Sequence, residues 1–289
     1  MPAFTAQESE PSLRRVGTYT RRVSDHLSLR LYESTKPHDS KIAALQKGLI
    51  LVVNGQEAVR EGTGFGSPVL AYSDETYFSG SSSLYVAARS RRRAILKVFN
   101  MDRVARNSFR NVTLENHAAS SFIERLGHLY RAHPRMRFLT LKELTGSVNV
   151  GKVFPEAASV GKVSVTYTVE ESRVTVKADF SDVCMKGLRK VFVLNEQGST
   201  LFRSYSDSSG TELTDGQIGA WDVVEAEWAC LSTLRCDAGF RLRRVEGSIL
   251  RRGRECLSGS LDWAGLDYEV SLGTDVFEYV IELLGGGRP

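Results

Sequence analysis

The sequence predicts a mainly β protein, an antiparallel sandwich or open barrel with one short helix near the middle of the chain. Three observations support this. Apolar residues recur with a period of two along most of the chain, turn-forming residues separate these runs, and one segment alone has a helical period. Many short strands between turns are typical of sandwiches and barrels, whereas parallel sheets need a helix between consecutive strands.

The first expected strands lie in the N-terminal third. Leu27, Leu29 and Leu31 share one face of an alternating run. Residues 48–53 are continuously apolar, as in a strand buried on both faces. Asn54-Gly55 follows as a hairpin turn, because both residue types tolerate positive φ. Further strands are expected at 68–72, 76–79, 84–88 and 94–99.

Residues 122–132 are expected to form the helix. Ser121 and Glu124 have the spacing of a capping box, and Pro134 ends the pattern. Its apolar face consists of Phe122, Leu126, Leu129 and Tyr130.

Strands resume after the helix. The clearest hairpin joins 163–169 to 174–180, and a second is expected between 190–194 and 200–205, with Asn195-Glu196-Gln197-Gly198 as its turn. Residues 276–284 are interpreted as a strand because they are rich in β-branched and aromatic side chains. A helix between Thr274 and Gly285 is the alternative. Further strands are expected at 223–228, 240–245 and 268–272.

The 289 residues suit a single β domain, 1–289, or a two-part organisation, 13–145 and 146–289. The hydrophobic share of 42% and charged share of 25% are ordinary for a globular protein. No apolar stretch approaches the roughly 20 residues that cross a bilayer, and the N-terminus lacks the apolar segment of a secretory signal. A cytoplasmic protein without membrane association is therefore expected, and homo-oligomerisation stays open.

The cysteines Cys184, Cys230, Cys236 and Cys256 lack the CxxC spacing of zinc and redox sites. They are interpreted as buried free thiols, with a Cys230–Cys236 disulfide as the alternative. No metal and no cofactor are predicted.

The glycine-rich stretch 60–68 is the first candidate site. A bend in a strand is its structural interpretation, since no helix follows to make a phosphate cradle. Its functional interpretation gathers Glu61, Phe65, Asp74 and Tyr77 at the mouth of a sheet, where carboxylates beside aromatic rings suit sugar binding or acid/base chemistry.

The second candidate site is Arg203, Tyr205 and Trp221, which would line a concave sheet if their strands are neighbours. The alternative is a solvated face with cross-strand ion pairs. Glu124 and His128 share a helix face, but no HExxH motif accompanies them, so an ion pair is favoured over a metal site.

Arginine dominates the basic residues, with 28 Arg against 10 Lys, while the formal net charge is only +4. Runs at 89–93, 103–110, 241–244 and 251–254 would form a stripe for a nucleic-acid backbone if they lay together. Acidic residues interrupt them, so nucleic acid is a disfavoured partner that is not excluded.

Residues 163–222 resemble the β-sandwich domains of polysaccharide lyases and mutarotase-like proteins, in long hairpins with arginine and aromatic residues on alternating strands. The resemblance covers about a fifth of the chain and no catalytic motif, and it implies a carbohydrate ligand. The leading hypothesis is thus a β protein that binds a polar organic ligand, with carbohydrate as the first class. The alternatives are an acid/base enzyme (lyase, epimerase or isomerase) on the same scaffold and a nucleic-acid-associated or structural interaction protein.

Overall fold

The computed structural model describes residues 13–33, 47–59, 63–72, 76–87, 94–102, 159–219, 221–257 and 261–285. The helix expected at 122–132 lies outside the described residues. Most of what is described is β-strand, and the helical element within it is a single 3-10 turn, η3 (Asp215–Ile218).

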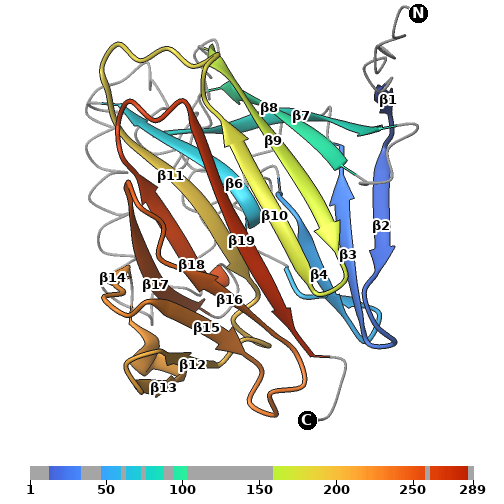
Figure 1. Ribbon diagram of the computed structural model, residues 1–289, viewed down its shortest axis with the longest axis vertical. Helices are drawn as coiled ribbons and strands as arrows, with labels where there is room; N and C mark the ends of the chain where they lie inside the picture. The colour runs from blue at the N-terminus through green and yellow to red at the C-terminus, as the bar shows by residue number, and fades with distance from the viewer. Residues whose placement is uncertain are drawn as a thin grey trace, which may run out of the picture. The chain divides into compact units, whose positions relative to one another are not determined.

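The larger of the two sheets has 15 strands, all paired in antiparallel fashion. Its first series of strands, in spatial order, is β13 (Glu212–Thr214), β12 (Ser204–Asp207), β15 (Trp228–Ser232), β16 (Gly239–Arg243), β19 (Val276–Leu284), β10 (Arg173–Asp179), β9 (Ser159–Glu170), β8 (Ala94–Asp102) and β7 (Thr76–Ala87), with β1 (Leu13–Arg15) beside β7. The second series is β6 (Gly64–Tyr72), β11 (Leu188–Gln197), β18 (Leu261–Val270), β17 (Ser248–Leu257) and β14 (Asp222–Val223). Figure 1 shows β19, β10 and β9 side by side within the first series.

The smaller sheet contains β2 (Thr18–Arg22), β3 (Leu27–Tyr32), β4 (Ile50–Val53) and β5 (Gln56–Glu57). Neither sheet closes on itself, so the arrangement is sandwich-like and the predicted fold class is confirmed. The larger sheet combines both halves of the sequence, because β8, β7 and β6 from the first half lie between β9 and β11 from the second half.

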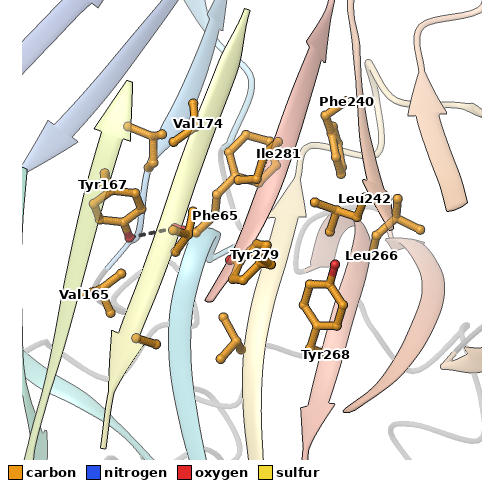
Figure 2. Close-up of a cluster of buried hydrophobic side chains, with 14 of the residues drawn as sticks. Phe65, Val165, Tyr167, Val174, Phe240, Leu242, Leu266, Tyr268, Tyr279 and Ile281 are labelled. Atoms are coloured by element: carbon orange, nitrogen blue, oxygen red, sulfur yellow. Dashed lines mark hydrogen bonds between the residues drawn. The ribbon is translucent and has the colours of Figure 1, made fainter. Parts of the chain in front are cut away.

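The two series of the larger sheet face each other across an aromatic core. Tyr167 on β9 donates a hydrogen bond to the carbonyl of Phe65 on β6 (2.8 Å), as Figure 2 shows. Tyr279 on β19 donates to Oδ1 of Asn195 on β11 (2.5 Å). Tyr268 on β18 donates to the carbonyl of Arg243 on β16 (2.5 Å). Each phenol thus brings one large apolar ring into the core and has a partner for its hydroxyl.

Several local predictions are confirmed. Asn54 and Gly55 have φ of 50° and 80°, the left-handed values expected of a hairpin turn between β4 and β5. The hairpin of β9 and β10 forms as expected, and the C-terminal segment 276–284 is a strand, β19, rather than a helix. All four cysteines are free, as expected, but the prediction that they are buried holds only for Cys230, and it is wrong for Cys184, Cys236 and Cys256, which are exposed.

The expected hairpin between 190–194 and 200–205 is wrong. Strand β11 continues through Asn195, Glu196 and Gln197, and it pairs with β6 and β18, whereas β12 pairs with β13 and β15. The polar run resembles a turn in sequence, but its side chains find buried partners. Gln197, for example, accepts a hydrogen bond from the N–H of Leu51 and donates one to the carbonyl of Leu49. Tertiary hydrogen bonds therefore outweigh the local turn preference.

The glycine-rich stretch forms a bulge in β6, in agreement with its structural interpretation. Leu194 pairs with Ser67 and Asn195 pairs with Phe65, so Gly66 is the extra residue. Gly66 has a φ of 74°, and its N–H donates to the side chain of Asn195 (3.1 Å). The bulge therefore depends on a glycine at this position and on the asparagine opposite it.

Replacing Gly66 with alanine is expected to destabilise the protein more than replacing Gly55. Both positions have positive φ, which costs about 1–2 kcal/mol for a side chain. A Cβ at Gly66 would lie 2.8 Å from Oη of Tyr167, whereas a Cβ at Gly55 meets nothing within 4 Å. Overpacking typically adds about 1–3 kcal/mol at Gly66. Urea unfolding of both variants measures the difference, and equal losses would contradict the crowding argument.

Candidate functional site

One face of the second series combines acidic and aromatic side chains. Ala264, Leu266 and Tyr268 of β18 point into the core, so the alternate residues of β18 lie on the opposite face. Glu196 of β11 and Gly253 of β17 both pair with Gly265 of β18, which places them on that same face. We call this set of residues the aromatic–carboxylate face, and it consists of Phe192, Glu196, Trp221, Gly253, Trp263, Gly265 and Asp267.

Two acidic side chains converge at Gly265. A Cβ built on this glycine would lie 3.0 Å from Cγ of Glu196 and 3.0 Å from Oδ2 of Asp267. Glu196 is 7% exposed and accepts hydrogen bonds from the N–H (3.1 Å) and the hydroxyl (3.0 Å) of Thr63. Asp267 is 1% exposed and accepts one from the N–H of Asn195 (2.5 Å). The absent side chain of Gly265 thus leaves the space that the Cγ methylene of Glu196 and the carboxylate of Asp267 occupy.

Burial raises the pKa of Asp267 well above its ordinary value, and the charge of Glu196 raises it further. The N–H of Asn195 favours the ionised form and offsets only part of this effect. The like charge of Glu196 disfavours ionisation of Asp267, so Asp267 holds its proton more tightly than an isolated carboxyl group does. A protonated carboxyl group donates a hydrogen bond and an ionised one accepts, which is the combination that acid/base sites use.

Aromatic rings adjoin the carboxyl groups. The ring of Trp221 lies 5.6 Å from that of Phe192 and 6.1 Å from that of Trp263, between centroids. A Cβ at Gly253 would lie 2.6 Å from the ring of Trp263 and 3.0 Å from the backbone nitrogen of Trp221. Gly253 therefore leaves the room that lets both tryptophans lie close to β17.

Trp221 has a strained backbone. Its φ of 66° is rare for a bulky residue, and a hydrogen bond from Arg251 to its carbonyl (3.1 Å) helps to hold it. Strain of this kind costs about 1–3 kcal/mol and is concentrated at functional sites in proteins.

A charged triad lies at the other end of the face. Lys190 and Arg251 both contact Glu269, at 2.7 Å each. Burial alone would raise the pKa of Glu269, but the hydrogen bonds from these two cations outweigh it and lower the pKa. The triad therefore stays ionised at neutral pH.

The structure places the first predicted group, Glu61, Phe65, Asp74 and Tyr77, as follows. Phe65 is fully buried, with its ring 4.8 Å from that of Phe240. Tyr77 lies on β7 opposite Leu70 of β6. Glu61 and Asp74 lie outside the described residues.

The residues of the second predicted group, Arg203, Tyr205 and Trp221, all lie near β17, but they do not share one face of that strand. Trp221 belongs to the aromatic–carboxylate face. Tyr205 is buried under the guanidinium of Arg252 (5.0 Å), on the opposite face of β17. Arg203 donates twice to Asp215 (2.8 and 2.9 Å), which also contacts Arg254. Of these three, only Trp221 lies beside the paired carboxyl groups.

Sequence reasoning missed Glu196 and Asp267. Glu196 is hidden in the apparent turn 195–198, and Asp267 lies immediately before an expected strand at 268–272. The available signal was an acidic residue between Leu266 and Tyr268, in a run that continues into a strand. A charge at such a position is buried only when partners from other strands satisfy it.

Most described arginines of the basic runs contact acidic side chains, while Arg244 donates to the carbonyl of Glu225. Arg241 and Arg243 pair with Glu282, and Arg252 pairs with Asp222. The runs at 89–93 and 103–110, and the predicted pair Glu124 and His128, lie outside the described residues. A nucleic-acid partner therefore stays a prediction.

A buried amine lies away from this face. Lys97 on β8 is 1% exposed and donates to the carbonyls of Tyr32 (2.7 Å) and Lys47. Burial lowers its pKa to about 7, and the charge of Glu33 offsets part of this effect. The amine thus bonds to both segments that flank residues 34–46, one at Tyr32 and the other at Lys47.

Comparisons with known proteins identify no family. No protein-family model matches the chain, and no curated protein matches it. One solved structure, the Slr1438 protein of Synechocystis sp. PCC 6803, aligns over 99% of this chain and 100% of its own, with 8% identity and a TM-score of 0.36. A likeness this weak carries no argument about fold or function.

The described residues contain no helix with the length and apolar character needed to cross a membrane. They also contain no group of three or more histidine, cysteine or acidic residues placed to hold a metal ion.

Proposed function

We propose that the protein binds a polar organic ligand, with carbohydrate as the leading class, on the aromatic–carboxylate face. The observation that carries the proposal is the convergence of Glu196 and Asp267 beside Trp221 and Trp263. Carboxyl groups accept hydrogen bonds from sugar hydroxyls, and aromatic rings pack on the apolar C–H faces of a sugar. A few polar groups beside aromatic area is the usual composition of a small-molecule site.

Replacing Trp221 with alanine is expected to weaken sugar binding by at least about tenfold, because a buried aromatic contact is worth roughly 1.5 kcal/mol or more. Trp228→Ala is the matched control, since Trp228 lies on β15 against Arg241 and away from this face. Titration calorimetry with a panel of mono- and oligosaccharides measures the affinities, after circular dichroism has shown that both variants fold. Equal losses in the two variants, or no binding by the wild type, would reject the proposal.

An acid/base enzyme is the second candidate, and the raised pKa of Asp267 beside Glu196 favours it. In this role, one carboxyl group would donate a proton to the substrate while the other accepts one. Incubation with the same oligosaccharides, followed by chromatography, tests it. Wild-type turnover that Glu196→Gln and Asp267→Asn both abolish would support an enzyme, and unchanged substrates would reject it.

A further inference from the structure

A cluster of arginines lies on the other face of β17, away from the aromatic–carboxylate face. Arg252 and Arg254 alternate with Gly253 along the strand, so their side chains project from that opposite face. Arg203, which precedes β12, is joined to Arg254 by the carboxylate of Asp215, which contacts both guanidinium groups. We call Arg203, Arg254 and Asp215 the arginine–aspartate cluster, and its two positive charges outnumber its single negative charge.

The carboxylate of Asp215 satisfies only one of these two guanidinium groups. It binds Arg203 side-on, since Oδ1 accepts from Nε (2.8 Å) and Oδ2 accepts from Nη2 (2.9 Å). Nη2 of Arg254 lies 3.2 Å from the same Oδ1 and donates to the carbonyl of Ser199 (3.0 Å). Within the part of the chain that the structure describes, the buried Nε of Arg254 has no hydrogen-bond partner. A guanidinium group is suited to two parallel bonds to one oxyanion, and for Arg254 this pair is incomplete.

The cluster is open to solvent, and Asp215 lies on a strained turn. The side chain of Asp215 is 42% exposed and that of Arg203 is 43% exposed, so a dissolved anion reaches them without entering the core. The φ of Asp215 is 49°, in the left-handed region that residues with a side chain rarely adopt. A Cβ at the next residue, Gly216, would meet nothing within 4 Å, so the turn has open space beside it. The carboxylate can therefore rotate into solvent and leave the guanidinium groups to another anion.

We propose that the arginine–aspartate cluster binds a phosphate group, which takes the place of the Asp215 carboxylate. A carboxylate offers two oxygens, whereas a phosphate group offers at least three acceptor oxygens and can bind the forks of both arginines at once. Nε of Arg254 then gains a partner. The double negative charge of the phosphate also matches the two positive charges. The inference goes beyond the proposed function, because this site lies on the opposite face of β17 and needs no sugar.

Titration calorimetry on the full chain, at pH 8 and constant ionic strength, tests this inference. The probes are inorganic phosphate, glycerol phosphate and acetate. Phosphate is expected to bind at least about tenfold more tightly than acetate, which lacks the third oxygen and the second charge. Tighter binding of glycerol phosphate than of inorganic phosphate would assign the site to a phosphate ester, and the reverse order would assign it to the free ion. Acetate that binds as tightly as both phosphates, or no binding of either phosphate, would overturn the inference.

Variants locate phosphate binding on the cluster. Arg203→Lys and Arg254→Lys keep the charge but lose the fork, and each is expected to weaken binding at least about tenfold. Asp215→Asn removes the competing charge, and asparagine tolerates the positive φ, so it is expected to tighten binding at least about threefold.

Arg243→Lys is the matched control, because Arg243 is also half-exposed and pairs with Glu227 (2.7 Å) on another part of the sheet. It is expected to keep the wild-type affinity. Circular dichroism establishes first that each variant folds, and if Arg254→Lys does not, the exposed Arg203→Lys decides alone. Wild-type affinity in the lysine variants of the cluster, or weaker binding by Asp215→Asn, would overturn the inference.

Discussion

The difference in unfolding free energy between the wild-type protein and a Lys97→Met variant is expected to shift in favour of the wild type between pH 6 and pH 9. Burial lowers the pKa of Lys97 from 10.5 to about 7. Below pH 7 the amine is charged in both the folded and unfolded chains, and the folded protein bears the full cost of burying that charge. Between pH 7 and 10.5 the folded protein has released the proton while the unfolded chain retains it, so stability rises with pH.

The expected size of this effect is large. A shift of 3.5 units corresponds to about 5 kcal/mol over the whole range, and to about 2–3 kcal/mol by pH 9. Urea unfolding at pH 6, 7.5 and 9 measures it as the difference between wild type and variant. Lys177→Met, at an exposed position on β10, is the control and should show a constant difference. A constant difference for Lys97→Met as well would mean that its bonds to the two carbonyls keep the amine charged.

Asp267→Asn is expected to stabilise the protein at pH 7, with a gain that grows as the pH rises from about 4. The pKa of Asp267 is raised in the folded protein by burial and by Glu196. Above the unfolded pKa of 3.8, the unfolded chain releases the proton while the folded protein retains it, so wild-type stability falls with increasing pH. Asparagine has no proton to lose, and its Oδ1 still accepts the bond from Asn195.

The gain should increase with pH, because the folded wild-type protein must either keep a proton that the unfolded chain has released or bury a second charge beside Glu196. Chemical unfolding from pH 4 to pH 8 measures it, with Asp182→Asn as the exposed control. A variant that is less stable than wild type at every pH would show that the carboxyl group stabilises the fold. The pair would then be structural rather than a strained site. If the carboxyl group destabilises the fold but serves binding, the variant should be more stable than the wild type and should have lost ligand binding.

The site was less predictable than the fold, because its residues come from distant parts of the sequence. Asn195 and Asp267 are 72 residues apart, and Thr63 and Glu196 are 133 apart. Trp221 was among the predicted site residues and lies on this face, yet the carboxyl groups of the same face were missed. A pattern of residue types along one strand does not show which strand will lie next to it.

The sequence by itself determined where most strands begin and turn. Period-two alternation defines β3, β9 and β10, and Asn54-Gly55 defines a hairpin, because these features depend on residues that are neighbours in the chain. Only the tertiary structure decided the strand order, the path of β11 through Asn195–Gln197, and the meeting of Glu196 with Asp267 at Gly265. Pairing depends on hydrogen bonds and packing between strands far apart in sequence, and these interactions can bury polar residues that local preference would leave in a turn.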